Sequence, residues 1–218
     1  MLEQYIEIIK PYIIKLFEND STGHDISHLV RTMNIAVNLC EKENGDKLIV
    51  GISAFMHDIH RIMQNELGHF VSPKESLDTV REILAQTDLD EEKINKICYC
   101  IEHHEEYNWN GNNVDDLNTL ILQDADNLDA IGAIGIARTF TYGATHNIPF
   151  YNEEIPLNTN NDFCENKNSL SSIHHFYHKL FKLKENMNTA TAKKIAIERT
   201  EFMEKYVCEF MEEWNGKK

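Results

Sequence analysis

The sequence predicts an all-α protein, and three observations support this fold class. Apolar residues recur three and four positions apart through most of the 218 residues, which is the spacing of one helix face. No segment alternates apolar and polar residues convincingly, as a half-buried strand would. Asp and Ser precede several of the apolar stripes, where they can cap helix N-termini. The length suits one domain with an ordinary core.

The N-terminal half contains five apolar stripes. They fall at about residues 2–16, 30–40, 49–59, 77–84 and 94–101. Pro11 lies inside the first stripe and is expected to kink or divide that helix. Ser72 and Glu75 form a capping-box pattern with Pro at the first helical position, so the fourth helix is expected to begin there. Asp90 is expected to cap the fifth helix.

The C-terminal half predicts longer helices at about 117–140, 169–183 and 189–214. The stretch at about 146–168 is rich in Asn, contains Pro149 and Pro156, and lacks periodicity. Loops this long are usually functional or disordered. It is therefore either a lid over an active site or a plain surface loop. We expect a single domain over 1–218, with C-terminal helices at about 169–214.

Charge and cysteine usage limit the classes of partner. The net charge of −15 repels nucleic-acid phosphates, so we expect no nucleic-acid partner. A small anionic substrate would require locally concentrated positive charge, such as a metal ion or a lysine cluster.

No run approaches a membrane span, and the N-terminus does not resemble a signal peptide. Five cysteines without a CxxC pair favour reduced thiols in a cytoplasmic protein. The oligomeric state stays open.

The strongest local signal is His57-Asp58, directly after an apolar helical stripe. Burying two polar side chains there is costly unless both are satisfied. Both can reach one ion lodged at the helix end. His24 and His28 lie four residues apart and share a face if both are helical. Asp25 is expected to cap that helix.

A third polar group interrupts an apolar run. Asp124, Asp126 and Asp129 fall within six residues, and such carboxylates repel one another unless a cation or a base neutralises some of them. We expect Asp124 and Asp129 to face solvent and Asp126 to point inward. The three segments offer two imidazoles and two carboxylates, a set that suits Mn, Fe, Co, Ni, Mg or Zn. Such a set leaves positions open for water and substrate.

The order His28, His57-Asp58, Asp126 resembles the H…HD…D signature of the HD superfamily. Longer motifs are similar to its YedJ-like branch: Gly23-His24-Asp25-x-x-His28-x-x-Arg31, Phe55-x-His57-Asp58-Ile59, the segment from Gln123 to Arg138, and His175-Phe176-x-x-Lys179-Leu180-x-Lys182-Leu183. The resemblance covers nearly the whole chain. It implies an HD-domain helical bundle in which His28, His57, Asp58 and Asp126 bind a divalent metal ion that activates water. It leaves the natural substrate open.

The same resemblance implies that further histidines lie in or near the site. Ile101-Glu102-His103-His104-Glu105 is similar to the HHE segment of the HD-GYP branch, although the GYP part is absent. His104, and with it His24 and His103, are candidates for a second metal or for lining the site. For His103, a partly exposed helix histidine is the favoured alternative.

Four basic residues are candidates for binding substrate phosphate. Arg61 lies three residues after Asp58, where some HD nucleotidases have an acidic residue, which counts against those activities. A surface salt bridge is the alternative for Arg61. Lys179 and Lys182 are expected to share one helix face with His175, which could bind phosphate or simply be solvated.

The leading functional hypothesis is hydrolysis of a small phosphorylated substrate, namely a nucleotide, phosphomonoester or pyrophosphate, by metal-activated water. A di-iron oxygenase is one alternative, suggested by the extra histidines. A non-catalytic module that binds a phosphorylated signal is another, but such a module has no need of a metal with open positions.

Overall fold

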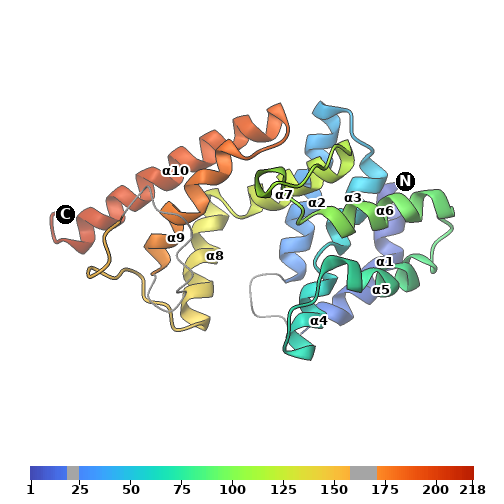
Figure 1. Ribbon diagram of the computed structural model, residues 1–218, viewed down its shortest axis with the longest axis horizontal. Coiled ribbons are helices and arrows are strands. Elements are labelled where there is room, and N and C mark those ends of the chain that lie inside the picture. The colour runs from blue at the N-terminus through green and yellow to red at the C-terminus, as the bar shows by residue number, and fades with distance from the viewer. Residues whose placement is uncertain (19–24, 158–170) are drawn as a thin grey trace. The chain divides into compact units, whose positions relative to one another are not determined.

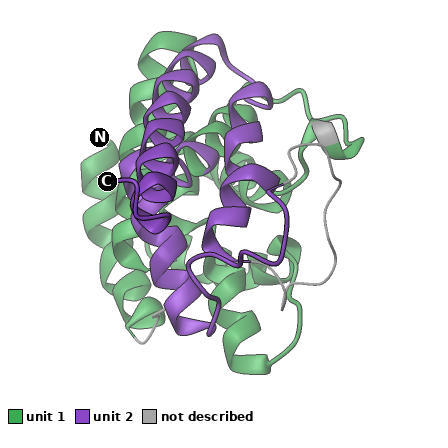
Figure 2. Ribbon diagram, turned by 90° about the vertical axis from the view of Figure 1, so that its left-hand side faces the viewer, with its two compact units in different colours: residues 1–126 green, residues 127–218 purple. Residues whose placement is uncertain are grey.

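The computed structural model describes residues 1–18, 25–157 and 171–218. Every regular element in these ranges is a helix, and no strand occurs among them, so the all-α prediction is confirmed (Figure 1). The chain divides into two compact units, residues 1–126 and 127–218, coloured green and purple in Figure 2. The prediction of one domain over 1–218 stays a prediction. No described helix is long and apolar enough to cross a membrane.

The first unit is built around α3. Its elements are α1 (Leu2–Phe17), α2 (Ile26–Glu43), α3 (Lys47–Met56), α4 (Ile59–Leu67), η1 (Pro73–Ser76), α5 (Leu77–Leu84), α6 (Glu91–His103), η2 (Asn108–Asn110) and most of α7 (Leu117–Asp129). All residues of α3 from Ile49 to Met56 are buried, and the helix packs against α1, α2 and α6. A helix that is apolar on all sides must lie in a core. The C-terminal end of α3 therefore lies in the interior of this unit.

The predicted caps are present. The Asp25 carboxylate accepts a hydrogen bond from the backbone N–H of His28 at 2.9 Å, and Asp90 accepts one from Lys93 at 2.9 Å. The Glu75 carboxylate accepts from the Ser72 backbone N–H at 2.8 Å, which completes a capping box. The turn that follows Ser72 is a 3-10 turn, and α5 begins after it.

The second unit packs around aromatic rings. Its elements after α7 are α8 (Gly132–Thr145), α9 (Ser172–His178), η4 (Leu180–Glu185) and α10 (Ala190–Trp214), and α8 packs against α9 and α10. The Phe140 ring of α8 lies 5.3 Å from Phe150, 6.2 Å from the buried Phe176, and 5.9 Å from Phe210. Such ring pairs contribute beyond the area they bury.

The structure corrects the helix predicted at 117–140. It ends at Asp129, and α8 begins at Gly132, whose φ of +80° only glycine adopts at low cost. A Cβ on Gly132 would also lie 3.1 Å from the Arg199 side chain. The apolar spacing continues across this break, which is why periodicity alone predicts one helix.

Two other helices bear on these predictions. Helix α1 runs through Pro11 without dividing, and the kink expected there stays a prediction. The helix predicted at 169–183 becomes the short α9 and the 3-10 helix η4. Of the loop predicted at 146–168, residues 146–157 are irregular and the rest lies outside the described residues, so its role as a lid stays a prediction.

We expect Gly132→Ala to destabilise the protein more than Gly68→Ala. Both glycines have φ near +70 to +80°, but a Cβ on Gly68 would meet nothing within 4 Å. The left-handed conformation costs about 1–2 kcal/mol at either site, and overpacking against Arg199 adds about 1–3 kcal/mol at Gly132 alone. Urea unfolding of both variants measures the difference. Equal losses would show that Arg199 moves aside freely.

Candidate metal centre

Three elements of the first unit bring the predicted ligands together. His28 lies in the first turn of α2, where the Asp25 cap fixes the backbone. His57 follows the last residue of α3, and Asp58 precedes the first residue of α4, so both lie at the junction of two helices. Asp126 projects from α7. His28 and His57 are fully buried, Asp58 nearly so, and the Asp126 side chain is 22% exposed.

The ligand atoms lie at the separations that one metal ion would need. The Nε2 atom of His28 is 3.3 Å from Oδ2 of Asp58 and 3.4 Å from Oδ1 of Asp126. The Nε2 atom of His57 is 3.5 Å and 3.8 Å from the same two oxygens. Ligands about 2.0–2.2 Å from a common ion are separated by roughly 3–3.5 Å. The described residues therefore fit a divalent cation, although their role as ligands stays a prediction.

Backbone contacts set the tautomer of His57. Its Nδ1 lies 2.9 Å from the carbonyl oxygen of Ala54, which can only accept, so Nδ1 carries the proton of the neutral ring. Burial lowers the pKa of His57 to about 4, despite the opposing effect of Asp58 and Asp126, and the ring is neutral at pH 7. Its Nε2 lone pair is buried, and no hydrogen-bond partner for it occurs among the described residues. A buried acceptor left in this way is costly unless a ligand satisfies it.

The carboxylates supply negative charge. Burial raises the pKa of Asp126, but the imidazoles of His57 and His28 outweigh this effect and lower the pKa below its ordinary value. Asp126 is therefore ionised at neutral pH. Beside the neutral ring of His57, the Asp126 carboxylate brings negative charge into the interior, which a divalent cation would offset.

Arg61 links this centre to a further carboxylate, that of Glu105. Its Nε donates to Oδ1 of Asp58 at 3.1 Å, and its Nη2 donates to Glu105 Oε1. Burial alone would raise the pKa of Glu105, but His60, His104 and Arg61 together lower it to about 2. Arg61 therefore forms salt bridges, as the alternative to phosphate binding predicted. These salt bridges lie beside the predicted metal ligands.

The other histidines predicted for the site have different environments. His104 is buried, and its ring centroid lies 5.1 Å from that of His57. His103 is partly exposed, 2.9 Å from a Glu106 oxygen, and belongs to no candidate ligand group of the described chain. His24 lies outside the described residues.

The predicted phosphate-binding residues of the C-terminal half lie in the second unit. His175, Lys179 and Lys182 are all exposed. The two lysines do not share one α-helix, because α9 ends at His178 and Lys182 lies in η4. Two backbone hydrogen bonds link the three residues along the chain. The Lys179 N–H donates to the His175 carbonyl at 3.0 Å, and the Lys182 N–H donates to the Lys179 carbonyl at 3.1 Å.

The prediction that Asp124 and Asp129 face solvent is wrong. Both are buried. The Arg138 guanidinium on α8 donates to Asp129 Oδ2 at 2.7 Å, so this carboxylate is neutralised inside the second unit. The helix break at Gly132 lets α8 present Arg138 to the end of α7.

The sequence prediction did not include His60 or Glu105 among the site residues, although Glu105 ends the HHE-like segment. Both side chains lie next to His104, with their candidate ligand atoms within 4.8 Å of one another. The available signals were the three-residue spacing of His57 and His60 and the position of Glu105 directly after His104.

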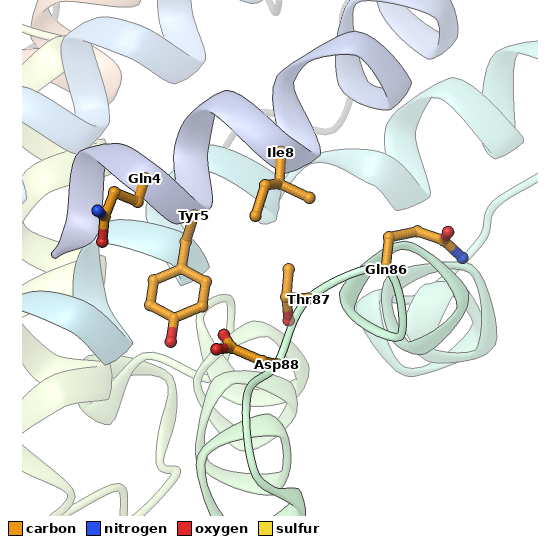
Figure 3. Close-up of a pocket in the computed structure, with 6 residues that line it drawn as sticks. All are labelled: Gln4, Tyr5, Ile8, Gln86, Thr87 and Asp88. Atoms are coloured by element: carbon orange, nitrogen blue, oxygen red, sulfur yellow. The ribbon is translucent and has the colours of Figure 1, made fainter.

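A separate hollow of about 480 Å³ lies elsewhere in the first unit. It is lined by Gln4, Tyr5 and Ile8 of α1 and by Gln86, Thr87 and Asp88 of the loop between α5 and α6 (Figure 3). Figure 3 shows the Tyr5 hydroxyl pointing toward the Asp88 carboxylate. None of the predicted site residues lines this hollow.

Comparison with known proteins decides the family. The family model described as HD domain matches residues 25–131, which include all four predicted ligands. An HD-superfamily hydrolase from Bacillus thuringiensis is 32% identical, with 99% of each chain covered and a TM-score of 0.74. The chain belongs to the HD superfamily. It has the fold of HD-superfamily hydrolases, and the histidine and aspartate cluster of this HD protein could hold a divalent metal ion.

YpgQ of Bacillus subtilis is another similar protein. Its sequence is 31% identical over 92% of this chain and 89% of YpgQ. A crystal structure of YpgQ in complex with ADP superposes with a TM-score of 0.73, at 28% identity over 98% of this chain and 97% of YpgQ. The placement of this HD protein in the YedJ-like branch stays a prediction.

Proposed function

We propose that this HD protein is a metal-dependent phosphohydrolase that acts on a small phosphorylated substrate, with a nucleotide as the favoured class. The convergence of His28, His57, Asp58 and Asp126 on one buried point carries the proposal. The ADP complex of YpgQ supports a nucleotide over other phosphate esters. The cation would be Mn, Fe, Co, Ni, Mg or Zn, because mixed imidazole and carboxylate ligation suits these ions.

When bound, such a cation lowers the pKa of a coordinated water and offsets charge that develops on phosphoryl oxygens. The protein's own groups prepare the centre for it. The Ala54 carbonyl holds His57 with Nε2 facing the carboxylates, and the Asp25 cap orients the first turn that carries His28. The partial exposure of Asp126 leaves the centre accessible to water and to a substrate phosphate.

Positive side chains would bind the substrate's phosphate groups. Arg61 is the candidate nearest the metal ligands, and its planar guanidinium can bind phosphate through two parallel hydrogen bonds. His175, Lys179 and Lys182 are exposed side chains of the second unit, and they are the other candidates that the sequence predicts for binding phosphate. Removal of one such lysine should weaken substrate binding more than turnover.

A substrate panel tests the proposal. Nucleoside mono-, di- and triphosphates, sugar phosphates and inorganic pyrophosphate are incubated with metal-free protein reloaded with each of the six metals. We expect release of phosphate or pyrophosphate that EDTA stops, and a raised KM with little change in kcat for Lys182→Ala. Absence of release with every substrate and metal would contradict the proposal. Oxygen uptake by the iron-loaded protein would instead support the oxygenase alternative.

A further inference from the structure

The turn that follows α6 borders the candidate metal centre. It comprises residues 104–107, directly after His103, the last residue of α6. Its Glu105 accepts a hydrogen bond from Arg61, and the same guanidinium donates to the Asp58 carboxylate at 3.1 Å. Arg61 is therefore held between a predicted metal ligand and this turn, so its orientation depends on where the turn lies.

Gln123 of α7 fixes the position of this turn. Its side chain is fully buried, and its amide nitrogen donates to the carbonyl oxygen of His103 at 3.1 Å and to that of Glu106 at 3.2 Å. The partners determine the orientation of the amide, because carbonyl oxygens can only accept and the amide nitrogen has two N–H groups to donate. The last carbonyl groups of a helix lack partners within it, so Gln123 satisfies one at the end of α6 and one in the turn.

The position of Gln123 on α7 connects the turn to a predicted metal ligand. Asp126 follows Gln123 by three residues, so the two lie on one face of the same helix. From Gln123 the contacts lead through the turn to Glu105, to Arg61 and back to the centre at Asp58. The helix that carries one predicted ligand thus also holds the turn that orients the arginine beside another.

We propose that Gln123 is a positioning residue for substrate binding: its two hydrogen bonds hold Glu105 in place, and Glu105 in turn holds the Arg61 guanidinium at the metal centre. A guanidinium whose orientation is fixed in advance loses less conformational freedom when it binds a phosphate group. The inference rests on the proposed function, because it gives Arg61 the role of binding substrate phosphate. It adds a residue that acts through Arg61 and not on the substrate itself.

Gln123→Met tests this role, because methionine is an unbranched side chain of similar length without N–H groups to donate. We expect the Mn²⁺-loaded variant to bind ADP, a nucleotide of the proposed class, about tenfold more weakly, because Arg61 loses its fixed orientation. The value of kcat/KM for the best substrate of the panel should fall by a similar factor, while Mn²⁺ affinity stays unchanged. Calorimetric titration measures both affinities.

Thr119→Val is the matched control for Gln123→Met. Thr119 is a fully buried polar residue one turn earlier on α7, and its hydroxyl donates to Asp116 at 2.8 Å. Its loss removes a buried hydrogen bond of the same helix without touching the contacts of Gln123. ADP affinity should therefore stay at the wild-type value.

An Arg61→Ala background separates a positioning role from a purely structural one. In that background Gln123→Met should have no further effect on ADP binding, because the group that it positions is absent. An equal loss in both backgrounds, or unchanged ADP affinity in a folded Gln123→Met protein, would overturn the inference. Circular dichroism establishes folding, and Gln123→Asn, whose shorter amide cannot reach both carbonyls, replaces Gln123→Met if that variant does not fold.

The outcome is separable from the proposed function. A wild type that binds ADP but releases no phosphate or pyrophosphate from any substrate would contradict the phosphohydrolase proposal alone, and the ADP affinities would still test Gln123. Hydrolysis that Gln123→Met leaves unchanged would contradict the role of Gln123 alone. A wild type that neither binds ADP nor hydrolyses any substrate would overturn both.

Discussion

Asp58→Ala is expected to abolish metal binding and phosphate release together while leaving a folded helical protein. Its Oδ2 is the oxygen shared by both buried imidazoles, at 3.3 Å from His28 and 3.5 Å from His57. Without it the ligand set loses one of two negative charges, and the cation loses a direct ligand. We expect kcat/KM to fall by about a thousandfold or more, because the charge stabilisation at the reacting phosphate is lost with the ion.

Asp78→Ala is the matched control for this variant, because Asp78 is an exposed aspartate of α5 in the same unit. It should keep the metal and the activity. Calorimetric titration of metal-free protein with Mn²⁺ and an assay of the same samples measure both quantities. An Asp58→Ala protein that keeps the full amount of metal would refute the assignment of Asp58 as a ligand.

Asp129→Ala is expected to cause a large loss of stability. This carboxylate is 1% exposed and accepts from the Arg138 guanidinium at 2.7 Å. Its removal takes away the carboxylate that the partly buried Arg138 guanidinium contacts, and breaking a buried ion pair in this way costs about 3–5 kcal/mol. Urea unfolding measures the loss.

The double variant Asp129→Ala/Arg138→Met tests whether the remaining charge of Arg138 or the lost packing around Asp129 causes the loss of stability. Met fills much of the volume of the arginine stem without a charge, so we expect it to recover at least half of the lost stability. A double variant as unstable as Asp129→Ala would show that packing around Asp129, and not the remaining charge of Arg138, accounts for the loss.

The parts of the site that sequence predicts are those set by local pattern. A stripe apolar on all sides identifies α3 as a core helix, and polar residues directly after it must lie at a buried helix end, where His57 and Asp58 are found. The cap at Asp25 likewise follows from residue type and position, and it places His28 in the first turn of α2. Local rules of this kind need no knowledge of distant contacts.

The parts that sequence could not predict depend on contacts between distant segments. Glu105 is brought to Arg61 from 44 residues away by the packing of α6 in the first unit, and no spacing in the sequence indicates that distance. Asp129 appears solvent-facing on a continuous helix, but the break at Gly132 brings Arg138 back to it. The partner that makes burial of a charge tolerable is thus set by tertiary structure.

The central claim is that His28, His57, Asp58 and Asp126 hold one cation in the interior of the first unit. Anomalous scattering from a crystal of the full chain grown with Mn²⁺, recorded at the manganese edge, tests it most directly. We predict a peak within about 2.0–2.3 Å of Nε2 of both histidines and of an oxygen of both aspartates. A fully Mn²⁺-loaded crystal with no anomalous peak among these four side chains would contradict the account.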